Sequence, residues 1–181
     1  MGKHNKIYDD YLYFLTMTIV DWIDIFTRPL YKHLIIESFK YCQKEKGLIL
    51  HAWVIMTNHI HLIASAKEGY HLSNILRDFK KHTSKKIIDL IKTENESRRK
   101  WMLERFYLAG KENPKIKEYK VWQEGNEAKE LHTNYFLDQK LNYIHNNPVN
   151  AEWVEKPEDY LYSSARDYCE IKGLLEIIRV D

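Results

Sequence analysis

The chain has 181 residues, of which 44% are hydrophobic and 30% are charged, and its formal net charge is only +2. This size and composition predict one domain, over residues 1–181, with a core between about residues 11 and 168. The small net charge excludes a histone-like polycation, so any nucleic-acid surface must come from local clustering. Cys42 and Cys169 are far apart and form no CxxC pattern, which argues against a disulfide framework or a zinc site.

The N-terminal ten residues contain no apolar stretch of the kind that a signal peptide requires. No apolar run in the sequence reaches the roughly 20 residues that span a bilayer. We therefore expect a cytoplasmic protein with no membrane partner.

The first half of the chain alternates strand and helix patterns. Tyr11–Val20 is rich in aromatic and β-branched residues, and its two apolar faces predict a central strand. Helical spacing follows over Leu30–Lys46, with Gly47 as a stop. Two further strands are predicted at Leu48–Met56 and His59–Ala66, and the short link between them favours an antiparallel hairpin.

The second half predicts three helices, at Leu72–Ile91, Trp101–Leu108 and Thr133–Asn147. Pro148 is expected to end the last of them. Gly110–Lys117 is predicted as a loop. The remaining extended patterns are a fourth strand at Tyr119–Gln123 and a possible short strand at Leu174–Val180.

This order of elements predicts an α+β protein. A β-α-β-β-α-β succession is the split βαβ of a ferredoxin-like antiparallel sheet, here with an insert before its fourth strand and an added C-terminal helix that carries Tyr143.

The sequence His59-Ile60-His61 falls on the third predicted strand. Residues two apart on a strand point to the same face, so both imidazoles project together while Ile60 packs on the other side. Two neutral imidazoles form half of a metal site. The alternative to a metal site is that the two histidines are half-buried residues on the surface of the sheet with a structural role only.

Tyr143 and Asn147 lie four residues apart on the last predicted helix, so they share a face. A tyrosine phenolate attacks phosphorus when a metal or a base activates it. The alternative is a structural tyrosine that anchors the end of the helix.

Positive charge is concentrated between residues 71 and 105, where ten Lys/Arg face five Asp/Glu. Arg77, Lys81 and Lys85 are spaced by four and form one helical stripe, with Lys80 and Lys86 beside it. Such a cluster suits contacts with phosphates, although a solvated helix face has the same pattern.

Several segments, taken in order, resemble the single-tyrosine HUH transposases, and specifically the REP-associated tyrosine transposases. HUH denotes two histidines around one hydrophobic residue. The resemblance covers about residues 11–168 and rests on HAWVIMTNHIHLI at 51–63, RDFKKHTSKKI at 77–87, VWQEG at 121–125, YIHNNPV at 143–149 and PEDYLYSSA at 157–165.

The resemblance implies a role for each matching residue. Tyr143 falls at the nucleophile, His59 and His61 at two metal ligands, and Asn147 at a third. It implies a transesterase that cuts and rejoins single-stranded DNA at palindromic hairpins through a 5′-phosphotyrosine, with Mg²⁺ or Mn²⁺ as cofactor. We expect the DNA backbone to contact Arg77, Lys80, Lys81, Lys85 and Lys86, and unpaired bases to stack on Trp122, Trp153 and exposed tyrosines.

The sequence leaves two alternative functions open. A catalytically inactive, host-adopted DNA- or RNA-binding domain would have the same fold. A replication or plasmid-type HUH nickase would share the motifs, but such enzymes tend to be larger. The family includes dimers, and its REP-associated branch is expected to act as a monomer, so the chain is expected to be a monomer or a homodimer.

Overall fold

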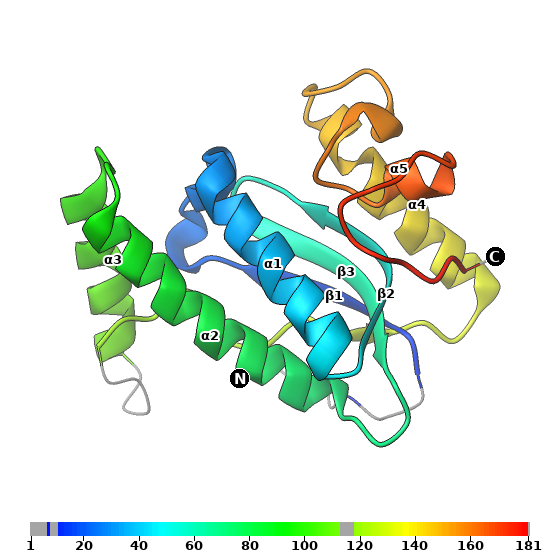
Figure 1. The fold of residues 1–181 in the computed structure, drawn as a ribbon, viewed down its shortest axis with the longest axis horizontal. Helices are drawn as coiled ribbons and strands as arrows, with labels where there is room; N and C mark the ends of the chain where they lie inside the picture. The colour runs from blue at the N-terminus through cyan, green and yellow to red at the C-terminus, as the bar shows by residue number, and fades with distance from the viewer. Residues whose placement is uncertain (1–6, 8–10, 113–117, 181) are drawn as a thin grey trace.

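A computed structural model describes residues 7, 11–112 and 118–180. Figure 1 shows the arrangement of the elements. The strands are β1 (Tyr13–Thr18), β2 (Leu48–Ile55), β3 (His59–Ala66) and β4 (Lys129–Glu130). The helices are α1 (Pro29–Glu45), α2 (Leu72–Thr93), α3 (Arg99–Lys111), α4 (Asn134–Asn150) and α5 (Ala165–Tyr168), and the 3-10 turns are η1 (Val20–Trp22), η2 (Ile25–Thr27) and η3 (Pro157–Asp159).

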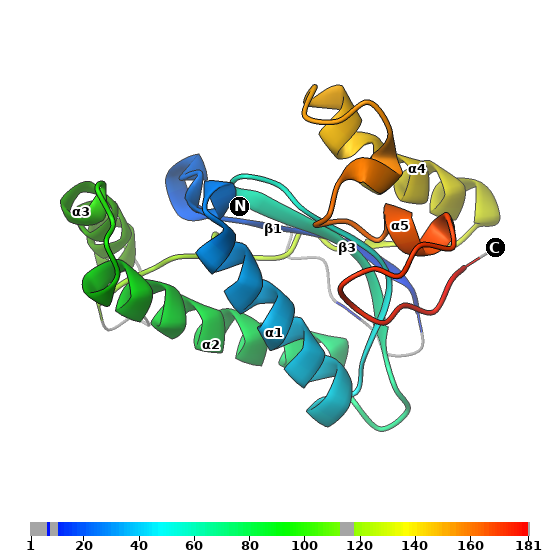
Figure 2. The same ribbon diagram turned by 45° about the horizontal axis from the view of Figure 1, so that its top comes forward.

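The strands form one antiparallel sheet in the order β2-β3-β1-β4. This order confirms the predicted α+β, ferredoxin-like architecture. It also confirms the interior position of β1 and the hairpin formed by β2 and β3. Helices α1 and α2 cover one face of the sheet, whereas α4 lies against the other (Figures 1 and 2).

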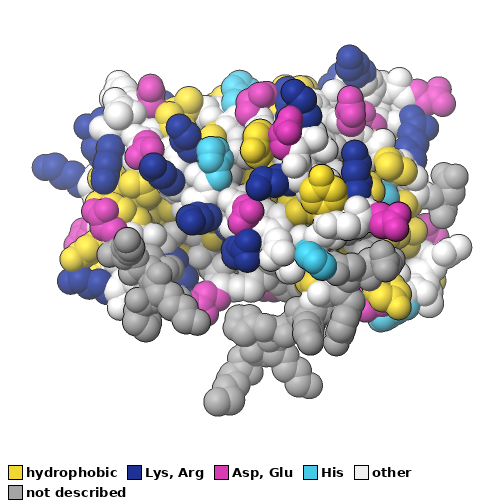
Figure 3. Space-filling model, turned by 60° about the horizontal axis from the view of Figure 1, so that its bottom comes forward, with side chains coloured by type: hydrophobic (Ala, Val, Ile, Leu, Met, Phe, Trp, Pro, Cys, Tyr) yellow, Lys and Arg dark blue, Asp and Glu magenta, His cyan; other side chains and the backbone are white. Residues whose placement is uncertain are grey.

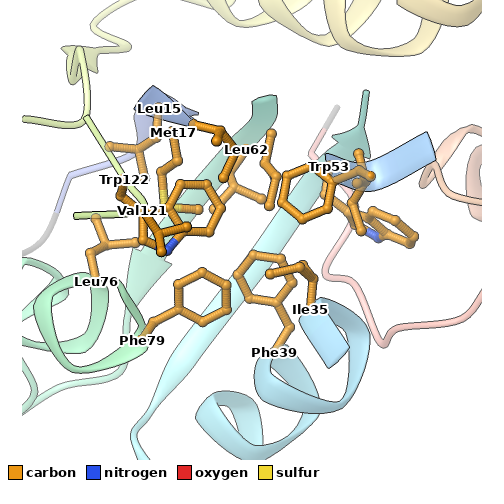
Figure 4. Close-up of a cluster of buried hydrophobic side chains, with 14 of the residues drawn as sticks. Leu15, Met17, Ile35, Phe39, Trp53, Leu62, Leu76, Phe79, Val121 and Trp122 are labelled. Carbon is orange, nitrogen blue, oxygen red and sulfur yellow. The ribbon is translucent and has the colours of Figure 1, made fainter. Parts of the chain in front are cut away.

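Alternation along the strands divides the core into two parts. The larger part lies between the sheet and helices α1 and α2, where Phe39 and Phe79 stack with ring centroids 4.4 Å apart beneath Leu62 (Figure 4). The smaller part lies under α4, where Leu137 and Ile144 pack with sheet residues that include Phe14, Val54 and Ile63. Burial of this apolar face holds α4 on the sheet.

Helix α4 begins as predicted but continues beyond its predicted end. The Thr133 hydroxyl caps it by accepting a hydrogen bond from the Phe136 amide. The prediction that Pro148 ends the helix is wrong, because the helix runs to Asn150 with Pro148 buried inside it. A proline this close to the C-terminus removes one hydrogen bond and interrupts little helix beyond itself.

The fourth strand lies later in the chain than predicted. Tyr119–Gln123 contributes only an isolated bridge between Trp122 and Ile19, and the strand itself is Lys129–Glu130. Backbone hydrogen bonds from Gln123 to Thr18 and from Thr16 to Asn126 run between these two points. The chain therefore follows the edge of β1 as an irregular strand, and the predicted strand Tyr119–Gln123 is the first part of this segment.

Two other predicted segments differ from the structure, and a third is mostly not described by it. The short helix predicted at Trp101–Leu108 is longer at both ends, as α3. Leu174–Val180 forms no strand, although the Ile178 amide donates to the Leu50 carbonyl. Most of the loop predicted at Gly110–Lys117 lies outside the described residues. Across the described part of the chain, no helix is both long and apolar enough to cross a membrane.

Acid should destabilise the fold through His145 on α4. Its Nε2 lies 3.0 Å from the Ser164 hydroxyl, and burial lowers the pKa of the imidazole to about 4. Between pH 6.5 and 4 the unfolded chain therefore binds a proton that the folded chain does not, so the free energy of unfolding falls as the pH falls, by roughly 3 kcal/mol. In urea titrations at pH 7 and pH 4, His145→Gln should lose less stability than the wild type; equal losses would contradict this assignment.

Candidate active site

His59 and His61 project from β3 toward α4. Their rings lie edge to face with centroids 4.7 Å apart. Ile60 and Leu62 belong to the core on the opposite face, as strand alternation predicts. The structure therefore brings the two imidazoles together on one surface of the sheet.

Tyr143 of α4 reaches the same place. Its hydroxyl lies 3.4 Å from His61 Nε2, and the two ring centroids are 5.1 Å apart. The His61 side chain is 4% exposed, whereas Tyr143 is 44% exposed. A strand and a helix that are 82 residues apart in the sequence thus meet within one chain, and they leave the phenol open to solvent.

Neighbouring polar side chains orient the two imidazoles. The His59 Nδ1–H donates to the Asn58 side-chain oxygen at 2.6 Å, which leaves His59 Nε2 without a proton. His61 Nδ1 lies 3.0 Å from the Thr16 hydroxyl on β1. When Thr16 accepts from this nitrogen, His61 Nε2 is also unprotonated, and this tautomer leaves an Nε2 on each ring to bind a metal.

The surroundings keep both imidazoles neutral. Burial lowers the pKa of His61 to about 3, with contributions from His59 and the Lys140 ammonium, and burial also lowers the pKa of His59. A neutral imidazole is the form that binds metal ions, so neither ring has to lose a proton for this near neutral pH.

Phe14 and Lys140 complete the surroundings of Tyr143. Phe14 stacks on His61 at 5.3 Å and meets the edge of the Tyr143 ring at 5.9 Å. The Lys140 ammonium lies 5.0 Å from the centre of the Phe14 ring and 5.4 Å from that of Tyr143. Sequence reasoning missed both residues, although Lys140 precedes Tyr143 by three positions and so shares its helix face.

The contact that the structure shows for Asn147 is with its own helix. Its side-chain amide donates to the Tyr143 carbonyl at 2.8 Å, within α4. In the described residues, no three His, Cys, Asp or Glu side chains are grouped as a metal site. His59 and His61 therefore offer a pair of nitrogen ligands, and further ligands would come from elsewhere.

The basic stripe belongs to α2, which lies on the face of the sheet opposite α4 (Figure 2). Lys81, Lys85 and Lys86 are exposed, whereas the exposed Arg77 side chain is paired with Asp78. Figure 3 brings this side forward and shows Lys and Arg interspersed with acidic side chains. The stripe is accessible to a phosphate backbone, but it is not part of the histidine–tyrosine cluster.

Lys80 and Trp122, which were expected to contact DNA, instead make contacts within the protein. The Lys80 ammonium donates to the carbonyls of Gln123 and Gly125, and burial lowers its pKa to about 8. Trp122 is buried and donates its indole N–H to Thr83. Between α2 and residues 118–123 lies a groove of about 660 Å³, whose lysines are Lys80, Lys81, Lys85, Lys92 and Lys120.

The family model described as "Transposase IS200 like" matches residues 11–110, which is more than half of the chain. The chain therefore belongs to the IS200-like transposase family. The matched region contains β1, β2, β3 and α2, and with them both histidines.

A solved REP-associated tyrosine transposase bound to a REP hairpin is similar in fold, with a TM-score of 0.61 and 18% identity over 100% of this chain and 94% of that chain. A crystal structure assigned to a transposase of Deinococcus radiodurans R1 is 14% identical over 81% of this chain and 97% of that chain, with a TM-score of 0.44. A comparison with curated proteins finds no match.

The contacts of Lys80 predict that it stabilises the fold. Lys80→Met should lower the free energy of unfolding by about 1–3 kcal/mol, because two carbonyls lose a charged donor. The neighbouring Lys81→Met is the control, and it should change stability by less than about 0.5 kcal/mol, since its side chain is exposed. Urea denaturation of the two variants tests this; equal stability would show that the Lys80 contacts contribute nothing.

Proposed function

We propose that the chain is a metal-dependent single-stranded DNA transesterase that cleaves and rejoins DNA at hairpin sites, with Tyr143 as its nucleophile. The observation that carries this proposal is the 3.4 Å distance between the Tyr143 hydroxyl and His61 Nε2. Because both residues belong to one chain, a single copy brings the proposed nucleophile to the histidine pair.

The proposed reaction exchanges one phosphoester for another. The Tyr143 oxygen forms a bond to phosphorus, and the bond from phosphorus to the 3′ oxygen breaks. The phenol loses its proton, and the leaving 3′ oxygen gains one. The product is a 5′-phosphotyrosine, which a 3′ hydroxyl attacks in the reverse sense, so the reaction needs no ATP.

The donor set fits a divalent ion with several open positions. Two neutral imidazoles would hold it through Nε2 of His59 and His61. Bound there, the ion would polarise the scissile phosphate and neutralise charge on its oxygens. Mg²⁺ and Mn²⁺ are the proposed ions, and imidazole suits Mn²⁺ better. Asn147 is the proposed third ligand through its side-chain oxygen, since the bond to the Tyr143 carbonyl uses the amide N–H.

Phe14 and Lys140 position the nucleophile in this proposal. The ring of Phe14 limits the movement of Tyr143 and excludes water from one side of His61. The Lys140 ammonium supplies positive charge beside the phenol, where a phosphate has to approach. In this proposal the two histidines bind the metal ion, and the lysine stabilises negative charge on the phosphate.

The proposed partner is single-stranded DNA that folds into a hairpin. The fold is similar to that of a transposase bound to a REP hairpin, which supports hairpins as the first substrates to test. Arg77, Lys81, Lys85 and Lys86 would contact the DNA backbone away from the scissile phosphate. Lys80 would act mainly by supporting the groove wall at Gln123 and Gly125.

Tyr143→Phe should abolish covalent protein–DNA adducts and leave hairpin affinity within about twofold, because only the attacking oxygen is removed. A labelled hairpin with Mn²⁺, resolved on a denaturing gel, measures the adduct. Adducts formed by the Phe variant would show that another residue attacks. Hairpin binding without any wild-type adduct would instead favour the inactive binding domain.

Thr16→Val should weaken Mn²⁺ binding by roughly tenfold, because His61 loses the partner that orients its ring. Thr18→Val is the matched control. Thr18 pairs with His59 across the same two strands, but no hydrogen bond joins the two side chains in the described structure. Titration calorimetry with Mn²⁺ compares the variants, and equal affinities would remove Thr16 from the site.

A further inference from the structure

An exposed tryptophan stands beside the candidate metal ligands. Trp22, in turn η1 directly after β1, is 60% exposed. Its ring lies edge to face with His59, with centroids 6.2 Å apart and planes at 74°. A large apolar ring thus faces solvent next to the histidine pair.

The backbone that presents this ring is strained. Asp21 and Trp22 both have a φ of 54°, in the left-handed region that residues with a side chain rarely adopt. A residue in this conformation is strained, and it persists only where its surroundings fix it. Arg105 of α3 does so here, since its guanidinium pairs with the Asp21 carboxylate at 2.7 Å.

Asn58 connects Trp22 to His59. Its side-chain N–H donates to the Trp22 carbonyl at 3.2 Å, while its side-chain oxygen accepts from His59 Nδ1. One amide therefore fixes both the turn and the imidazole. The position of the exposed ring relative to the histidine pair is built into the fold.

We infer that Trp22 is a stacking platform for an unpaired nucleobase next to the scissile phosphate. This inference rests on the proposed function, because the nucleobase belongs to the single strand that the histidines and Tyr143 would engage. In a single strand, each phosphate has a nucleobase on either side of it. A rigid ring beside the histidine pair is therefore close to the base next to a phosphate bound there. Aromatic rings stack on any base, because every base has a π-face. Trp22 would therefore supply affinity without reading the sequence.

The test separates contacts with bases from contacts with phosphates. Fluorescence anisotropy measures the affinity for a labelled ten-residue thymidine oligonucleotide and for an abasic strand of equal length. The wild type should prefer the strand with bases by roughly tenfold. Trp22→Gly should lose most of this preference, and Trp22→Phe should retain most of it.

Trp22→Gly also controls for folding. Glycine adopts a positive φ without strain, so this variant should be at least as stable as the wild type. Tyr41→Ala removes a similarly exposed ring, 57% exposed, from α1 on the other side of the sheet, and should leave the preference unchanged.

Two results would overturn the inference: no preference for bases in the wild type, or an unchanged preference in a folded Trp22→Gly protein. The hairpin adduct assay separates these results from failure of the proposed function. Adducts formed by the wild type, together with either result, would retain the transesterase and reject Trp22 as its platform.

Discussion

The antiparallel pairing of β1 with β3 determines both the core and the candidate site. In this register Thr16 lies opposite His61 on the face toward α4, where the apolar pair Phe14 and Ile63 also lies. Leu15 lies opposite Leu62 on the face toward α1 and α2. A slip of one residue would exchange the two faces, burying polar side chains among the helices. The large apolar area under α1 and α2 therefore also fixes the direction of the imidazoles.

Besides the β1–β3 register, the candidate site depends on the docking of α4, which brings Tyr143 to the histidines. Leu137 and Ile144 pack the helix against the sheet. Because Tyr143 is next to Ile144 in the sequence, this packing also places the Tyr143 side chain. His145 and Ser164 join the same helix to the segment beyond it. Tyr143 itself is exposed, so its placement depends on the packing of its neighbours.

The sequence predicted what depends on local periodicity. It predicted the three long strands, helices α1 and α2, and the shared face of His59 and His61, because alternation and helical spacing are local. It could not predict that Pro148 is accommodated within α4, or that the edge strand is paired at Lys129–Glu130, because tertiary contacts decide both. The meeting of Tyr143 with His61 and the burial of Lys80 are likewise tertiary, and even helical spacing does not separate Lys80 from the exposed Lys81.

Several features that oppose stability gather at one end of the sheet. His61 is an imidazole buried so deeply that it cannot readily take up a proton, and the nearby Trp22 exposes its ring on a strained turn. A sequence selected for stability alone would replace both, since a glycine suits the turn and an apolar residue suits the buried strand position. Asn58 lies between these features, tied to Trp22 and to His59. Strained or unfavourably buried residues that contact the same neighbours are expected where a surface serves binding or chemistry. Tyr143 lies beside that surface.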